Sequence, residues 1–185
     1  MKNLILGTVA AVLLAAGSYA QTSEVGQRAE NQQDRISQGI QSGQITAGGA
    51  ANLESKEAAI NHEVRNDRSL NGGKLTPQEK QTVNQQQNQM SKQIYTDKHN
   101  AARQNFGSSE VGKRQENQQD RIANGVQSGK LNAGQTARLE KNQAAINQEV
   151  KTDRKVNGGT LTAAEKKQVN RQQNRQSRRI YKAKH

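Results

Sequence analysis

Asn71-Gly72-Gly73-Lys74-Leu75-Thr76-Pro77-Gln78-Glu79 is the stretch that decides the fold, because it ends one helix and begins the next. Asparagine and glycine tolerate positive φ, the conformation in which helices commonly end. Thr76 and Glu79 match a capping box, in which the hydroxyl accepts from the N3 amide and the carboxylate accepts from the amide of the cap. Pro77 falls at the first helical position, where its missing N–H costs nothing. The stretch therefore predicts a tight connection between two helices.

The same pattern returns 86 residues later, at positions 157–165. When residues 24–99 are placed over residues 110–185 without a gap, 45 of the 76 positions are identical. Self-similarity at a fixed period indicates duplicated structural units. We therefore divide the chain into a first unit at residues 21–99, a linker at 100–109 and a second unit at 110–185.

Within each unit the apolar residues recur at helical spacing, and no alternating run of strand length occurs. In the first unit we expect helices at about residues 23–38, from a cap at Thr46 to the turn at Asn71, and from Pro77 to about residue 98. Their apolar faces carry Val25, Ala29, Ile36 and Ile40, then Leu53, Ile60 and Val64, then Val83, Met90, Ile94 and Tyr95. The predicted fold class is all-α, with two tandem three-helix units built as antiparallel hairpins or bundles. Each core is thin, so we expect pairing of the two units, or of two chains in a homo-oligomer, to supplement it.

Residues 1–20 have the features of a secretory signal peptide. Lys2 supplies the positive end, an apolar run spans residues 4–16, and Ser18-Tyr19-Ala20 is a cleavage site of the small-x-small type. The run is shorter than the roughly 20 apolar residues that a membrane span requires. The sequence thus predicts an exported protein, periplasmic or secreted, that does not span a membrane. It contains no cysteine, so no disulfide framework is expected.

The composition argues against an enzyme. After residue 20 the chain has three aromatic residues, and Asn and Gln make up about a quarter of the whole sequence. A general acid–base pair needs a dry, shaped pocket, which so little apolar bulk can hardly build. We expect Glu57 and Glu63 to lie on solvated helix faces beside Lys56 and Arg65. The three histidines have no metal-type or nucleophile spacing, and we expect no cofactor; they are His62, His99 and His185.

The turn at Asn71-Gly72 also resembles a degenerate EF-hand loop. Asp67, Ser69 and Asn71 match its opening, but Glu79 falls one residue past the bidentate position. In the second unit Lys155 occupies a ligand position, which oxygen-only coordination of calcium does not accept. We therefore predict no metal site.

Charge separates the two units. Residues 24–109 contain ten Lys/Arg and nine Asp/Glu, a net charge of +1, whereas residues 110–185 contain seventeen and seven, a net charge of +10. Residues 166–185 include eight basic residues and no acidic one. On a helix, five of them form one stripe with spacings of four, four, three and four: Lys167, Arg171, Arg175, Arg178 and Lys182. The equivalent positions of the first unit are Gln81, Gln85, Gln89, Lys92 and Thr96.

This basic segment is the candidate binding site. A row of cations attracts an anionic polymer by releasing its counterions, so the expected partner is a nucleic acid, a polysaccharide or an envelope component. Sequence-specific reading of bases is not expected, because aromatic side chains for stacking are nearly absent. The alternative is a solvated face that keeps the protein soluble. The candidate residues are Lys166, Lys167, Arg171, Arg175, Arg178, Arg179, Lys182 and Lys184.

Two resemblances add to this interpretation. The motifs at residues 30–36 (ENQQDRI), 42–43 (SG), 71–76 (NGGKLT) and 94–100 (IYTDKHN) resemble a group of uncharacterised exported bacterial helical-repeat proteins, which carries no assigned activity. A thinner resemblance is to the periplasmic chaperones of the Spy/CpxP type, which are all-helical and marked by L-T-x-x-Q. Residues 75–79 and 161–165 match that motif except for a final Glu, and residues 131–135 match it in part. The second resemblance implies a holdase for unfolded proteins, so two functions remain open: polyanion binding and a chaperone role.

Overall fold

The structure is a computed structural model that describes residues 23–185, and the predicted signal peptide at residues 1–20 lies outside that part. The described part is all-helical, which confirms the predicted fold class. It contains six helices: α1 (Glu24–Gln41), α2 (Ala47–Leu70), α3 (Pro77–His99), α4 (Glu110–Gln127), α5 (Ala133–Val156) and α6 (Ala163–Lys184). The first helix ends three residues later than predicted. Gly39 lies inside its last turn, where a Cβ would meet Ile45 Cδ1 at 2.4 Å, so this glycine makes room for packing.

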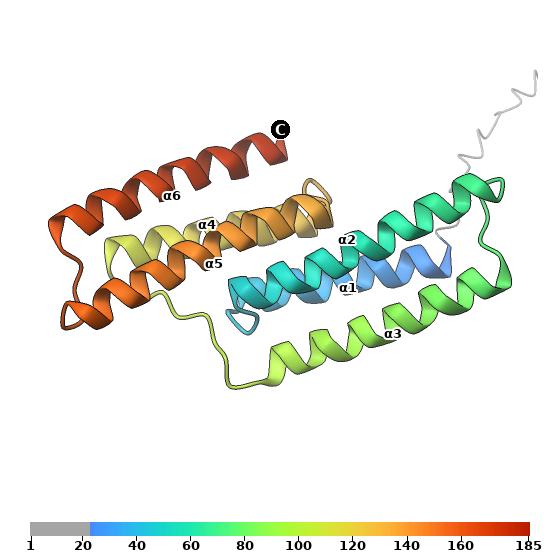
Figure 1. The fold of residues 1–185 in the computed structure, drawn as a ribbon, viewed down its shortest axis with the longest axis horizontal. Coiled ribbons are helices and arrows are strands. Elements are labelled where there is room, and N and C mark those ends of the chain that lie inside the picture. Colours follow the sequence, from blue (N-terminus) through green and yellow to red (C-terminus); the bar gives the residue numbers. More distant parts are fainter. Residues whose placement is uncertain (1–22) are drawn as a thin grey trace, which may run out of the picture.

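The six helices form two three-helix groups that pack on each other. Helices α1 and α2 both contact α3, while α4 and α5 both contact α6. The groups meet through α2 with α5 and through α1 with α4, so these four helices form the centre (Figure 1). Helices α3 and α6 lie at the two outer sides of this centre. The two units therefore pack against each other within one chain, which is one of the two kinds of pairing expected to supplement their thin cores.

The helix starts follow the predicted local chemistry. Thr76 Oγ1 accepts from Glu79 N at 3.3 Å, and the Glu79 carboxylate accepts from Thr76 N at 2.8 Å. The same capping box forms at Thr162 and Glu165. Asn71 Nδ2 also donates to both Glu79 oxygens at 2.9 Å. The Glu79 carboxylate is therefore bound within the turn that resembles a degenerate EF-hand loop. Gly72 has a φ of +62°, as the turn requires.

Replacing Thr162 with Ala should lower the free energy of unfolding by about 1 kcal/mol, the usual loss for a removed N-cap. The hydroxyl is the acceptor for Glu165 N, which then loses its partner at the start of α6. Urea denaturation of the two proteins measures the difference. Thr82→Ala is the control, because Thr82 is exposed inside α3 and Ala is the better helix former there. Equal stability of the Thr162→Ala variant and the original chain would contradict the role of the box.

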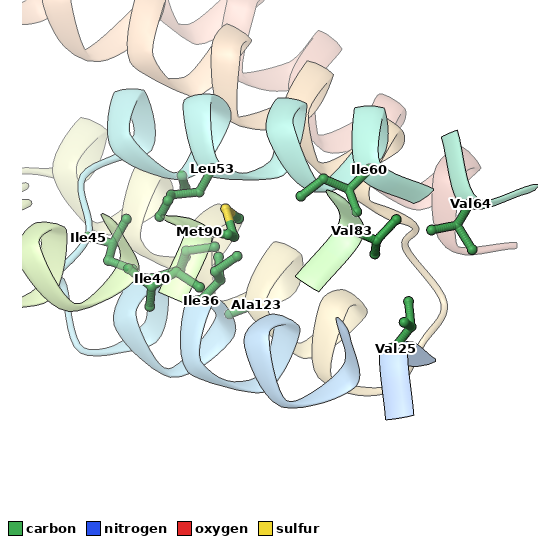
Figure 2. Close-up of a cluster of buried hydrophobic side chains, with 12 residues drawn as sticks. Val25, Ile36, Ile40, Ile45, Leu53, Ile60, Val64, Val83, Met90 and Ala123 are labelled. Carbon is green, nitrogen blue, oxygen red and sulfur yellow. The ribbon is translucent and has the colours of Figure 1, made fainter. Parts of the chain in front are cut away.

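The largest apolar cluster lies in the first unit and extends across the interface between the units. Ile36, Leu53, Val83 and Ile94 are fully buried in it, and Ala123 of α4 joins them from the second unit (Figure 2). The second unit has two smaller clusters, one around Ile122 and Ile180 and one around Val111 and Val169. Because the first cluster includes a residue of α4, the two units share part of their core.

The placement of Tyr95 in the apolar face of the third helix was wrong. Successive residues of a helix lie about 100° apart, so Ile94 and Tyr95 cannot both face the core. Ile94 is fully buried, whereas Tyr95 is 60% exposed and stacks on His99 with ring centroids 4.1 Å apart. Tyr181 and His185 repeat this exposed stack at 4.3 Å. His99 and His185 thus lie at the surface ends of α3 and α6.

Buried glutamines fill the gaps in the apolar faces and join neighbouring helices. Five of them donate the side-chain amide to a backbone carbonyl of another helix at 2.7 to 2.9 Å. The bonds are Gln32 to Gln87 O at 2.7 Å, Gln87 to Val25 O at 2.8 Å, Gln118 to Gln173 O at 2.7 Å, Gln173 to Val111 O at 2.8 Å and Gln176 to Leu139 O at 2.9 Å. The Oε1 atom of each of these glutamines is buried without a partner. The helices are therefore joined partly by glutamine side chains whose Nε2 is hydrogen-bonded and whose Oε1 is not.

Candidate functional site

Helix α6 carries the predicted basic stripe on its solvent-facing side. All five stripe residues are exposed, and they span about 22 Å of helix at 1.5 Å per residue. Arg179, also exposed, lies beside the stripe on the side of α5. Among residues 23–185 the only ion pair joins Lys80 and Glu24, so no carboxylate of that part forms an ion pair with the stripe. The stripe is a row of cations available to a ligand.

The other two candidate residues face α4 instead. Lys184 is half-buried, and its Nζ donates to Arg121 O at 3.3 Å. Lys166 lines a small hollow together with Ser109 and Glu110, at the start of α4. The eight basic residues of the segment are therefore divided between two sides of the helix, with six toward solvent and α5 and two toward α4.

A groove between α5 and α6 runs beside the stripe. One hollow of about 590 Å³ is lined by Gln135, Arg138, Leu139, Lys141 and Asn142 of α5 and by Arg179, Lys182 and Ala183 of α6. A second hollow of about 230 Å³ shares Asn142 and Arg179 with the first and adds Arg175 and Glu149. Cations therefore stand on both walls. Glu149 is the one carboxylate among the lining residues, and it accepts from Gln168 and Gln172 at 2.7 Å.

Arg138 and Lys141 were not among the predicted site residues. The sequence places them 47 and 44 residues before residue 185, on a different helix from the stripe. A signal for them exists in the comparison of the repeats, because their equivalents in the first unit are Asn52 and Ser55. The contrast in charge between the units is thus present on α5 as well as on α6.

The equivalent positions of the first unit do not place cations on both walls. The positions of Arg179, Lys182 and Ala183 are taken there by Gln93, Thr96 and Asp97. Its one lysine at a lining position is Lys56, whose Nζ donates to Gln93. A hollow of about 240 Å³ in the first unit is the equivalent of the second hollow, and Lys56 is the one cation among its lining residues.

Three carboxyl groups lie in the centre of the molecule. Glu54, Glu57 and Glu140 are fully inaccessible to solvent, so the prediction that Glu57 lies on a solvated face was wrong. Helix α2 packs against α1 and α3 of its own unit and also against α5. Glu54, three residues before Glu57 on α2, lies close enough to Glu140 of α5 to raise the pKa of that group. Glu63 is half-buried and accepts from Gln86 at 2.7 Å.

Burial shifts the protonation of these groups. It raises the pKa of Glu54 to about 8, that of Glu57 to about 7 and that of Glu140 to about 8, because a charged carboxylate loses its hydration. Amide donors oppose the shift: Gln33 donates to Glu54 at 2.9 Å and Gln119 donates to Glu140 at 2.8 Å. The nearby Glu54 carboxyl raises the pKa of Glu140 further. These groups are closed off from any substrate, so they bear on stability.

Neither a metal centre nor a membrane span is found in the part of the chain that the structure describes. No three His, Cys, Asp or Glu side chains within residues 23–185 are grouped so that they could hold a metal ion. None of the helices α1 to α6 is long and apolar enough to cross a membrane.

Comparison with known proteins gives no further guide to the site. No family model, no curated protein and no solved structure matches the chain. The resemblances to exported helical-repeat proteins and to Spy/CpxP-type chaperones therefore stay predictions. The functional argument rests on the charges and the geometry of the second unit.

Proposed function

We propose that the protein is an exported, non-enzymatic binding protein whose second unit holds an anionic polymer along α6 and the groove beside it. The observation that carries this proposal is the contrast between two similar helix groups. The second unit presents six exposed cations on the outer side of α6 with no carboxylate partner within the described residues. The equivalent positions of the first unit hold one lysine. A polyanion that binds there releases counterions, which supplies affinity without any reading of sequence.

A chaperone role has less support. A surface that holds unfolded clients needs a connected apolar area. The large apolar side chains that are exposed in residues 23–185 are Leu70, Tyr95, Val156 and Tyr181. They lie near the ends of four different helices, α2, α3, α5 and α6, and both tyrosines stack on histidines. Such isolated residues are normal on a monomeric protein.

The test replaces stripe residues with those of the first unit. Lys167, Arg171 and Arg175 become Gln and Lys182 becomes Thr, while Arg178 stays because its equivalent is Lys92. If each of the four contacts a phosphate, the slope of log affinity against log salt on duplex DNA should fall by about 3 to 4. Fluorescence anisotropy at several salt concentrations measures the slope. Because all four residues are exposed, the free energy of unfolding should scarcely change.

The control removes the same number of charges elsewhere in the second unit. It changes Lys113, Lys130, Lys151 and Lys155 to Gln, all of which are exposed and line neither hollow of the groove. Both variants then have the same net charge. A larger loss of slope in the stripe variant supports the site, and an equal loss in both would show that only net charge matters. The full chain is used because Ala123 contributes to the core of the first unit.

A further inference from the structure

The surface between the two units is held together differently from the inside of each unit. Helices α2 and α5 pack against each other there, as do α1 and α4 (Figure 1). Of the hydrogen bonds and ion pairs among residues 23–185, none joins α1, α2 or α3 to α4, α5 or α6. The apolar clusters also lie within the units, except that Ala123 of α4 joins the cluster of the first unit. The described units are therefore in contact without a polar bond between them.

Three buried carboxyl groups belong to the two helices that meet at this surface. Glu54 and Glu57 are on α2, and Glu140 is on α5. Glu54 and Glu140 are equivalent residues of the two units, 86 positions apart, and they lie close enough for the charge of one to act on the other. Glu57 acts in the same way on Glu54. Each of the three has one carboxyl oxygen that is buried without a hydrogen-bond partner.

The groups that face these carboxyls do not neutralise them. Amide side chains of α1, α2 and α4 donate to them: Gln33 to Glu54 at 2.9 Å, Asn61 to Glu57 at 3.3 Å and Gln119 to Glu140 at 2.8 Å. No Lys, Arg or His of the six helices, α3 and α6 included, forms an ion pair with them or lowers their pKa values. Ionisation therefore places like charges together where no opposite charge compensates them.

From these observations we propose that the surface between the units is a pH-controlled latch, which is closed while Glu54, Glu57 and Glu140 carry protons and opens as they ionise, so that the two units separate with their helices intact. Opening breaks no hydrogen bond between the described units and leaves the apolar clusters covered within each unit, apart from the contact of Ala123. Such opening of one part of a protein, at a lower cost than global unfolding, is common. The latch is independent of what the second unit binds.

The direction of the pH effect follows from proton binding. In the closed latch, burial raises the pKa of Glu54 and Glu140 to about 8 and that of Glu57 to about 7. In the open latch these groups regain water and the ordinary value of 4.5. The closed form therefore binds more protons between these values, and a rise in pH favours opening. Each group should raise the equilibrium constant for opening about tenfold per pH unit, up to its own pKa in the closed form.

Small-angle X-ray scattering and circular dichroism of the full chain between about pH 5 and about pH 9 test the latch. The radius of gyration should rise with pH by several ångströms, because the units move apart. The helical signal should stay constant over the same range, because the helices persist. Extrapolation of the scattering to zero protein concentration separates opening from association of chains.

A disulfide across the surface supplies a lock with its own control. A Cβ placed at Gly134 of α5 would lie 3.9 Å from the Cβ of Ala58 on α2, within the range of about 3.5–4.5 Å that disulfides require. The chain contains no cysteine, so Ala58→Cys with Gly134→Cys can form only this bond within one chain. The oxidised variant should keep the low-pH radius of gyration at about pH 9. The same variant in a reductant should open as the original chain does.

Substitution of the carboxyls tests their part in the latch. Glu57→Gln copies Gln143, which is buried at the equivalent position of α5, and should reduce the rise of the opening constant by about tenfold per pH unit. Adding Glu54→Gln and Glu140→Gln should hold the radius of gyration at its low-pH value throughout. Glu116→Gln is the control, because Glu116 is exposed on α4 and its change should leave the opening as it was.

Three results would overturn the latch. A helical signal that falls together with the rise in radius of gyration would mean that the whole chain unfolds. A constant radius of gyration up to about pH 9 would mean that the units stay together when the carboxyls ionise. An expansion that persists in the triple Gln variant, or in the oxidised disulfide variant, would mean that it comes from other groups or from another part of the chain.

Discussion

The free energy of unfolding should fall steadily as the pH is raised from about 4.5 to about 8. Glu54 and Glu140 are buried with raised pKa values, so both hold a proton in the folded chain over this range. In the unfolded chain they release it above the ordinary value of 4.5. Each such group lowers stability by about 1.4 kcal/mol per pH unit. Chemical denaturation at a series of pH values measures the slope.

The sign follows from proton binding. Between pH 4.5 and 8 the folded state binds more protons than the unfolded state, so a rise in pH favours unfolding. The stabilisation that Glu54 and Glu140 contribute is complete below pH 4.5 and is lost as the pH rises to their folded pKa of about 8. Glu57 adds to the loss up to its own pKa of about 7. Below pH 4.5 the opposite trend begins, because the capping carboxylates Glu79 and Glu165 have lowered pKa values and lose their bonds on protonation.

Glutamine at both positions should flatten the pH profile. Glu54→Gln with Glu140→Gln keeps the shape of the protonated side chains and removes their titration, so most of the decline between pH 5 and 8 should disappear. At pH 8 the double variant should therefore be more stable than the original chain. Glu116→Gln is the matched control, because Glu116 is exposed on α4 and its change should leave the slope as it was. A profile that the double variant does not alter would show that these carboxyls are ionised in the folded chain.

These carboxyls show where sequence reasoning stops. The turn at Asn71-Gly72-Gly73 and the capping boxes depend on residues within nine positions of one another, so the helix boundaries could be predicted from local chemistry. Helix α2, which carries Glu54 and Glu57, also packs against α5, which follows it by more than 60 residues. The apolar periodicity of one helix reveals its face toward its own unit. It does not reveal a second face that the partner unit covers.

The sequence likewise predicts one part of the candidate site and not the other. The stripe on α6 was predictable because its five cations repeat at helical spacing along one segment. The groove was not, since its second wall comes from Arg138 and Lys141 on a helix whose position beside α6 only the fold defines.

The second large effect is expected at the buried glutamines, where Met and Ala should act in opposite directions. Gln173 is fully buried, its Nε2 donates to Val111 O at 2.8 Å, and its Oε1 has no partner. Gln173→Met keeps most of the volume and gives up one bond, worth about 0.5–1.5 kcal/mol. It also removes an unsatisfied oxygen that costs about 1–3 kcal/mol. We therefore expect the Met variant to be more stable than the original chain by about 1 kcal/mol.

Gln173→Ala should instead lower the free energy of unfolding by about 2–5 kcal/mol, the range for large buried side chains cut back to Ala. Urea denaturation with a common m-value separates the two variants, and Gln87→Met and Gln87→Ala repeat the test in the first unit, where Gln87 donates to Val25 O at 2.8 Å. A Met variant that is markedly less stable would mean that the amide bonds outweigh their unpaired oxygens. A Met variant that is more stable leaves these glutamines with another role. They would then fix the register of neighbouring helices, since each amide selects one backbone carbonyl where an apolar side chain selects none.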